Sequence, residues 1–115
     1  MITMKPVDEP DVLALLAKGR FDLPLEGYVM TDGEEYLGSC LFRTEGQTVT
    51  VLDAAAPDTM TLDGVVRAAI AKAQNEGAQF FRIARNIEAL ARWAQVFVKD
   101  TPEPVNVTKI FEICD

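Results

Sequence analysis

The chain has 115 residues and no histidine, and its 18 acidic against 11 basic side chains give a formal net charge of −7. This acidic balance would repel phosphate backbones and anionic lipid, so we expect neither nucleic acid nor a membrane as a partner. Because histidine is the most common metal ligand and the usual general base near neutral pH, its absence disfavours zinc sites and triad hydrolases, and we expect no metal site.

Length and composition indicate one folded domain spanning residues 1–115, since 49% of the residues are hydrophobic and 25% are charged. No apolar run is long enough to span a bilayer, and the first residues lack the pattern of a signal peptide, so we expect a cytoplasmic protein. Cys40 and Cys114 do not have the spacing of a disulfide framework, and we expect both to be reduced.

The first predicted element in the chain is a helix, with residues 1–7 as a lead-in. Asp8 is suited to the N-cap position, and Pro10 follows where a missing amide does no harm. Gly19 ends the apolar run, and residues 20–24 connect the helix to the strands.

Two antiparallel strands are predicted next, at Leu25–Thr31 and Tyr36–Thr44. The dipeptide Asp32-Gly33 is typical of the tight turn between such strands. Glu45-Gly46 turns the chain again, so the strand that follows completes a three-stranded meander.

A strand–helix–strand unit forms the centre of the predicted fold. Thr48–Ala55 alternates polar and apolar residues and ends before Pro57, as a half-buried strand does. An amphipathic helix follows, with Thr61 as its N-cap and Gly77 at its end. Its apolar stripe consists of Leu62, Val65, Val66, Ala69, Ile70 and Ala73. Gln79–Ala84 forms a second strand, which we expect to lie parallel to the first through a right-handed crossover.

A third helix and a last strand complete the prediction. Asn86 is a suitable N-cap for the helix, and Phe97-Val98 is expected to begin a short strand. Apolar residues at helical spacing are Ile87, Leu90, Ala91 and Ala94. Residues 100–104 form a proline-rich break, and Val105–Ile113 is the final strand.

This order of elements predicts an α+β fold, with a mixed, mostly antiparallel, twisted sheet around a central βαβ crossover. Ligands of such a unit bind beyond the carboxyl ends of its parallel strands. Amides at the start of the crossover helix are suited to phosphate groups, and a glycine such as Gly64 permits their close approach.

The step Ala55-x-Pro57, followed by a loop, Gly64 and an amphipathic helix, resembles the GNAT superfamily of acetyl-CoA-dependent N-acetyltransferases. A later Asn-x-x-Ala segment of that family is matched by Asn86 and Ala89, and its closing Gly-Phe is half matched by Val96-Phe97. The resemblance implies a GNAT-like fold, acetyl-CoA as the cofactor and a small-molecule or peptide amine as the acceptor. The cofactor-binding residues that it implies are Ala55, Thr61, Leu62, Gly64, Arg85 and Asn86.

The chain departs from this family at several positions. Thr59 stands where the cofactor loop of the family has Arg or Gln, and Leu62 stands where it has its first glycine. Asp58 and Asp63 flank the expected anion site, where a carboxylate competes with phosphate for helix amides. Trp93 occupies the place of a frequently catalytic tyrosine, and an indole cannot donate a catalytic proton.

Three sets of side chains have both a functional and a structural interpretation. Asp53 is the only carboxylate on the central strand and therefore the candidate base for an acceptor amine, or simply a solvent-facing strand residue. Gly64 either admits a phosphate or lets the helix pack closely on the sheet. The basic residues Arg67, Arg82 and Arg85 either gather the phosphates of a CoA-like ligand or remain solvated, with Arg67 paired to Asp63.

Two functions remain open from the sequence. One is an acyltransferase that moves an acetyl group from acetyl-CoA to an amine, mainly by positioning the reactants. The other is a catalytically inactive relative with the same fold that acts as a binding or protein-interaction module. An open sheet with a C-terminal edge strand also suggests a homodimer.

Overall fold

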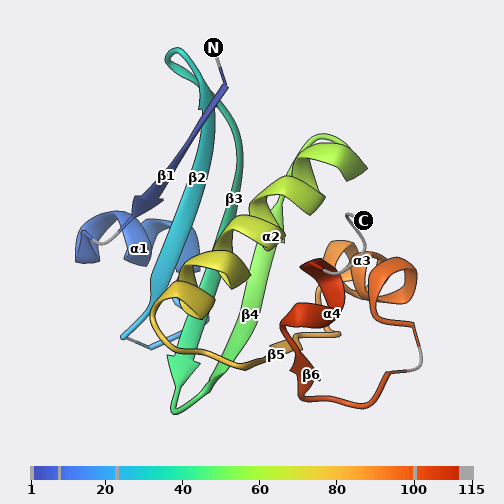
Figure 1. Cartoon of the computed structure of the whole chain (residues 1–115). Helices are drawn as coiled ribbons and strands as arrows, with labels where there is room; N and C mark the ends of the chain where they lie inside the picture. The colour runs from blue at the N-terminus through green and yellow to red at the C-terminus, as the bar shows by residue number, and fades with distance from the viewer. Residues whose placement is uncertain (1, 8, 23, 100, 112–115) are drawn as a thin grey trace.

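The computed structural model describes residues 2–7, 9–22, 24–99 and 101–111. Over these residues the chain forms one six-stranded sheet in the order β1-β2-β3-β4-β5-β6 (Figure 1). The strands are β1 Ile2–Val7, β2 Glu26–Asp32, β3 Glu35–Glu45, β4 Thr48–Ala55, β5 Phe80–Ile83 and β6 Val105–Asn106. The helices are α1 Pro10–Ala17, α2 Thr59–Asn75, α3 Glu88–Phe97 and α4 Thr108–Phe111.

The central strand–helix–strand unit is confirmed. β4 has the predicted bounds, and all six residues of the predicted apolar stripe are buried on α2. β5 runs parallel to β4, with pairs from Thr48–Phe80 to Val51–Ile83. Gly77 follows α2 with a φ of +111°, a backbone conformation that glycine adopts readily.

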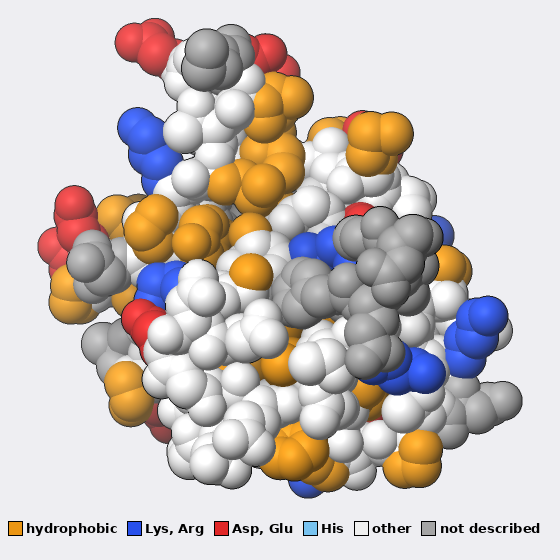
Figure 2. Space-filling model, in the orientation of Figure 1, with side chains coloured by type: hydrophobic (Ala, Val, Ile, Leu, Met, Phe, Trp, Pro, Cys, Tyr) orange, Lys and Arg blue, Asp and Glu red, His pale blue; other side chains and the backbone are white. Residues whose placement is uncertain are grey.

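The meander is confirmed as well. β2, β3 and β4 pair in antiparallel order, and Gly33 and Gly46 provide the positive φ angles of the two turns. Because β4–β5 is the parallel pair and the other pairings are antiparallel, the predicted mixed α+β sheet is the one observed. Figure 2 shows acidic side chains at the tip of the β2–β3 hairpin, which gives this end of the molecule a negative charge.

The first residues form a strand, so the expectation of a simple lead-in is wrong. β1 pairs antiparallel with β2 from Ile2–Asp32 to Val7–Gly27. Its side chains are mostly exposed, so no apolar alternation reveals it in the sequence. The helix after it begins at Pro10 as expected, with Glu9 in the N-cap position, and Asp8 lies outside the described residues.

The last segment also differs from the prediction. Phe97 ends α3 and Val98 caps it, so no strand begins there. β6 is only two residues long, and α4 follows it, because the Asn106 side chain accepts hydrogen bonds from the amide and hydroxyl of Thr108 and turns the chain. The C-terminal edge strand that suggested a homodimer is therefore much shorter than expected.

The two faces of the sheet are covered unequally. α2 and α3 pack on one face around a large hydrophobic cluster that includes Phe42, Phe81 and Trp93. α1 packs on the other face through a small cluster consisting of Leu13, Ala17, Leu25 and Leu41. Ligands of a βαβ unit bind beyond the carboxyl ends of its parallel strands, which here are β4 and β5.

Candidate functional site

The parallel pair β4–β5 separates at its carboxyl end. Its last pair is Val51–Ile83, followed by one hydrogen bond of 3.0 Å from the amide of Ala84 to the carbonyl of Val51. β4 continues to Ala55, and Leu52 is an extra residue in its pairing with β3, because Leu41 faces Asp53 and Phe42 faces Val51. Such a bulge bends a strand, and the residues of β4 beyond it have no pair on β5 within the described residues.

A cleft of about 480 Å³ opens at this end, between the start of α2 and α3. Its lining residues are Ala56, Pro57, Asp58, Thr59, Leu62, Ala89, Arg92, Trp93, Gln95, Val96 and Phe97. Most of these side chains are apolar, and a few polar groups lie among them, as in typical ligand pockets. Of the six residues implied as cofactor-binding by the resemblance, Leu62 lines this cleft.

Asp58, not Thr61, caps α2, which corrects the predicted N-cap. The Asp58 carboxylate accepts a hydrogen bond of 2.7 Å from the amide of Thr61, which lies in the first turn. Hydrogen bonds from the amide and hydroxyl of Thr61 lower the pKa of Asp58. A carboxylate of the chain itself therefore occupies the helix terminus where a phosphate was expected.

Trp93 joins the two helices that border the cleft. Its indole Nε1 donates a hydrogen bond of 2.8 Å to Asp63 Oδ1 on α2, and Arg67 Nε donates to the same oxygen at 2.8 Å. Arg67 also donates to the carbonyl of Ile110 at 2.6 Å and lies over the Phe97 ring. The alternative in which Arg67 pairs with Asp63 is therefore the one observed.

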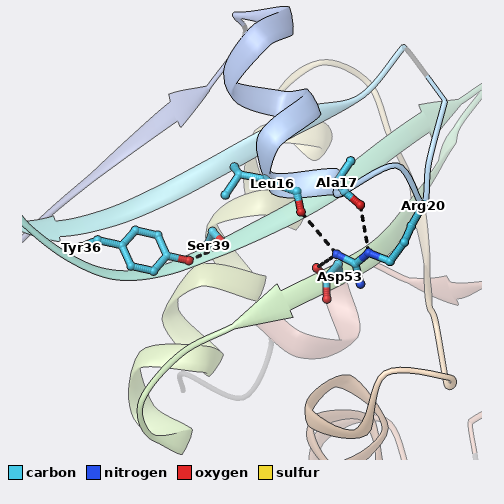
Figure 3. A network of polar contacts seen from close by, with 6 residues as sticks. All are labelled: Leu16, Ala17, Arg20, Tyr36, Ser39 and Asp53. Carbon is cyan, nitrogen blue, oxygen red and sulfur yellow. Dashed lines mark hydrogen bonds and ion pairs between the residues drawn. The ribbon is translucent and has the colours of Figure 1, made fainter.

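Asp53 faces α1 instead of the cleft. Its Oδ2 accepts a hydrogen bond of 2.6 Å from Arg20 Nη2, and Arg20 also donates to the carbonyls of Leu16 and Ala17 at the end of α1 (Figure 3). On β3, the strand next to β4, the Tyr36 hydroxyl donates to Ser39 Oγ at 2.8 Å (Figure 3). The candidate base is thus held in an ion pair with a guanidinium.

Gly64 lies on the side of α2 that faces β2. A Cβ added there would come within 3.2 Å of Met30 Cε, a tight contact. The glycine therefore allows close packing of the helix on the sheet, which was its structural interpretation.

Arg85 and Asn86 follow β5 but do not line the cleft. Arg85 Nη2 donates to Glu103 Oε1 at 2.8 Å, and Glu103 Oε2 accepts from the amide of Ile83 at 2.9 Å. Asn86 is exposed and does not cap α3, because Ile87 occupies the N-cap position. Ala55, at the exposed end of β4, pairs with Ser39.

Cys40 is a buried free thiol on β3. Burial raises the pKa of this thiol far above its usual value, and the negative charge of Asp53 raises it further. The thiol therefore stays protonated and is not a nucleophile. Cys114 lies outside the described residues.

Among the described residues, no group of three or more His, Cys, Asp or Glu side chains is placed to hold a metal ion. Over the same part of the chain, no helix has the length and apolar character needed to cross a membrane.

Sequence reasoning missed several residues of the cleft, including Arg92, Gln95 and Ala56. The helical spacing of Ala89, Arg92 and Val96 places them on one face of α3, and that spacing was the available signal. The pattern does not show which neighbouring element this face meets.

Comparisons with known proteins identify the fold. No protein-family profile matches the chain. No curated protein sequence matches it. The ribosomal-protein-S18-alanine N-acetyltransferase from Escherichia coli is similar in structure, with a TM-score of 0.62 and 11% identity over 84% of this chain and 76% of that chain. A Bacillus subtilis acetyltransferase in complex with CoA is similar with a TM-score of 0.55 and 22% identity. That match covers 72% of this chain and 64% of the acetyltransferase.

The expected fold is therefore confirmed: the chain has the mixed α+β fold of the GNAT N-acetyltransferases. At these low identities the similarity concerns the fold, and the chemistry has to be argued from the cleft and its residues.

Proposed function

We propose that the protein binds acetyl-CoA, or a similar CoA thioester, in the cleft between the start of α2 and α3 and transfers the acyl group to an amine. One observation carries this proposal: β4 separates from β5 after the Val51–Ile83 pair, and the cleft opens beyond that point. Ligands of βαβ units bind at this position. The similarity in fold to an acetyltransferase in complex with CoA adds support.

The cleft is suited to the apolar portion of such a ligand, but its carboxylate repels the phosphates. The exposed Val96 and the half-buried Ala89 and Phe97 offer apolar surface to an adenine ring or a pantetheine chain. Asp58 disfavours a phosphate at the α2 terminus, because its carboxylate already accepts the hydrogen bond of the Thr61 amide. We therefore expect weaker binding than in a site whose helix amides are free for the phosphate.

The proposed catalysis depends mainly on positioning. The thioester supplies an activated acyl group, and the amine must reach it in neutral form. Trp93 supplies no proton, since its indole N–H is bonded to Asp63. Asp53 faces α1 and is paired with Arg20 Nη2 at 2.6 Å, so it does not reach an amine in the cleft. The proton of the amine passes instead to the departing CoA thiolate, which leaves as the free thiol.

Charge favours a cationic acceptor. The tip of the β2–β3 hairpin carries the exposed acidic residues Asp32, Glu34 and Glu35, and β3 continues from it to pair with the end of β4. A negative potential there raises the local concentration of a protonated amine. A small-molecule or peptide amine is therefore the proposed acceptor class.

Calorimetric titration with acetyl-CoA tests the proposal. We expect binding by the wild-type protein and clear weakening in Ala89→Leu, because Ala89 lines the cleft and the larger side chain fills it. The matched control is Ala14→Leu, which makes the same change at an exposed position of α1. The absence of detectable heat at millimolar acetyl-CoA with folded wild-type protein would remove the proposal.

The second candidate is a catalytically inactive binding or protein-interaction module with the same fold. The carboxylate of Asp58 at the α2 terminus and the bonded indole of Trp93 favour it. Release of free CoA thiol in the presence of amines separates the two functions. Binding of acetyl-CoA without thiol release across a panel of amines supports the inactive module.

We also propose that residues 1–115 act as one domain. Leu41 and Phe42 are neighbours on β3, yet they belong to the two hydrophobic clusters on opposite faces of the sheet. The clusters therefore share one sheet, and we expect a single cooperative unfolding transition by two spectroscopic probes.

A further inference from the structure

We propose that Arg92 on α3 holds the anionic end of the ligand in the cleft, in place of the helix terminus of α2. This inference rests on the proposed function, because it concerns the phosphate groups of a CoA-type ligand in the same cleft. It departs from the expectation that the phosphates meet the chain between Thr61 and Gly64.

Four arginines of the chain already have partners within the protein. Arg20, Arg67 and Arg85 each form an ion pair with a carboxylate, and Arg43 donates to two backbone carbonyls. Within the described part of the chain, Arg82 and Arg92 form no hydrogen bond or ion pair, and of these two Arg92 lines the cleft. With 18 acidic side chains in the protein, an arginine beside a cleft that remains without a carboxylate partner is suited to an anion from outside.

The two sides of the cleft carry opposite charges. Among the described residues that line it, Arg92 is the only cation and Asp58 is the only anion. Asp58 is fixed at the α2 terminus by its bond to Thr61 and repels phosphate there. A phosphate in this cleft is therefore stabilised on the α3 side and destabilised on the α2 side.

Apolar side chains flank Arg92 on α3. Ala89 and Val96 lie one turn to either side of it on α3, and both line the cleft. This apolar surface suits the uncharged part of a CoA-type ligand. A guanidinium between two apolar positions can bind a phosphate in a bidentate manner while the rest of the ligand packs along the helix.

The test compares Arg92→Gln with a matched control, Arg82→Gln. Arg82 is exposed on β5 and does not line the cleft, so the control removes the same charge elsewhere. Calorimetric titration with CoA at low ionic strength is expected to give about tenfold weaker binding for Arg92→Gln, and wild-type affinity within about twofold for Arg82→Gln. Arg92→Lys keeps the charge and should recover part of the loss.

Salt dependence is the second measurement. Wild-type affinity for CoA should fall as ionic strength rises, and Arg92→Gln should show a weaker dependence, since one charge contact is missing. Thermal melts of both variants check that the fold is intact.

The two possible failures are distinguishable. If Arg92→Gln and Arg82→Gln bind CoA equally well, this inference is overturned and the proposed function stands. If the folded wild-type protein does not bind CoA at all, the proposed function fails and this inference fails with it.

Discussion

Each face of the sheet has one network that joins an aspartate to an arginine, and the two networks differ in what surrounds them. On the α2 side, Asp63 accepts hydrogen bonds from the fully buried indole of Trp93 and from Arg67, and the Asp63 and Arg67 side chains are 27% and 22% exposed. On the α1 side, Asp53 meets Arg20, whose side chain is 40% exposed. Both ion pairs are partly open to water, and the network on the α2 side also holds a fully buried donor, the indole N–H of Trp93.

This difference indicates where the stability of the molecule resides. A buried donor is costly to leave without an acceptor, whereas partly exposed ion pairs are screened and contribute little. α1 is further held by a cluster of only four buried residues. We therefore expect α1 to open locally at a lower free energy than α2, which slower amide hydrogen exchange in α2 would demonstrate.

The largest expected effect on the free energy of unfolding comes from truncating a core side chain on either face of the sheet. Phe81→Ala on the α2 side should lower the free energy of unfolding by about 3–5 kcal/mol, because its fully buried ring packs against Trp93. Leu13→Ala on the α1 side should cost about 2 kcal/mol, since the small cluster there collapses more easily. Urea unfolding measures both variants. A larger loss for Leu13→Ala would reverse the comparison.

Removal of the carboxylate on the α2 side is next in size. Asp63→Ala leaves the indole N–H of Trp93 without an acceptor, and we expect a loss of about 1–3 kcal/mol in the free energy of unfolding. Asp63→Asn retains an acceptor oxygen and serves as the control. Equal stability of Asp63→Ala and the wild type in urea would show that the buried indole N–H of Trp93 does not depend on Asp63 as its acceptor.

Disruption of the ion pair on the α1 side should have a smaller effect. Arg20→Gln is expected to cost about 0.2–1 kcal/mol, and the effect should largely disappear in about 1 M salt. A double-mutant cycle with Asp53→Asn measures the coupling. A coupling energy that is large and independent of salt would contradict the distinction between the two faces.

The smallest expected effect concerns Asp58 and appears only at low pH. Hydrogen bonds from Thr61 lower its folded-state pKa below 3.8. Its stabilising contribution is therefore present above the unfolded pKa and is lost as the pH falls through the lower folded value. Asp58→Asn keeps the cap but not the titration, so it should flatten the fall in the urea midpoint between about pH 5 and about pH 2. An unchanged acid profile in the variant would argue against this role.

Local signals in the sequence were sufficient for the central elements. The alternation in Thr48–Ala55, the apolar stripe of α2 and the turns at Gly33 and Gly46 predicted β4, the helix and the meander correctly. β1 was missed because it is an exposed edge strand whose partner residues lie 20 to 30 positions away. The end of the chain was mistaken for a strand because a side chain, Asn106, turns it after two residues.

The site was harder to predict than the fold. Asp63 and Arg67 are one helical turn apart, so their pairing could be read from the sequence. The partners of Asp53 and Arg85 are 33 and 18 residues away, and residue spacing does not reveal such contacts. Asp53 was proposed as the only carboxylate on the central strand and Arg85 for its place after a strand end, and tertiary contacts engage both with other groups.

Trp93 offers the most direct test of the central claim, that a CoA thioester binds between α2 and α3. It is the only tryptophan of the chain and it lines the cleft, so its indole N–H resonance and its fluorescence report on one place. Titration with acetyl-CoA should shift that resonance and change the fluorescence in a saturable way, with the amides of α1 unaffected. Saturating acetyl-CoA that leaves the Trp93 signals unchanged would contradict the account.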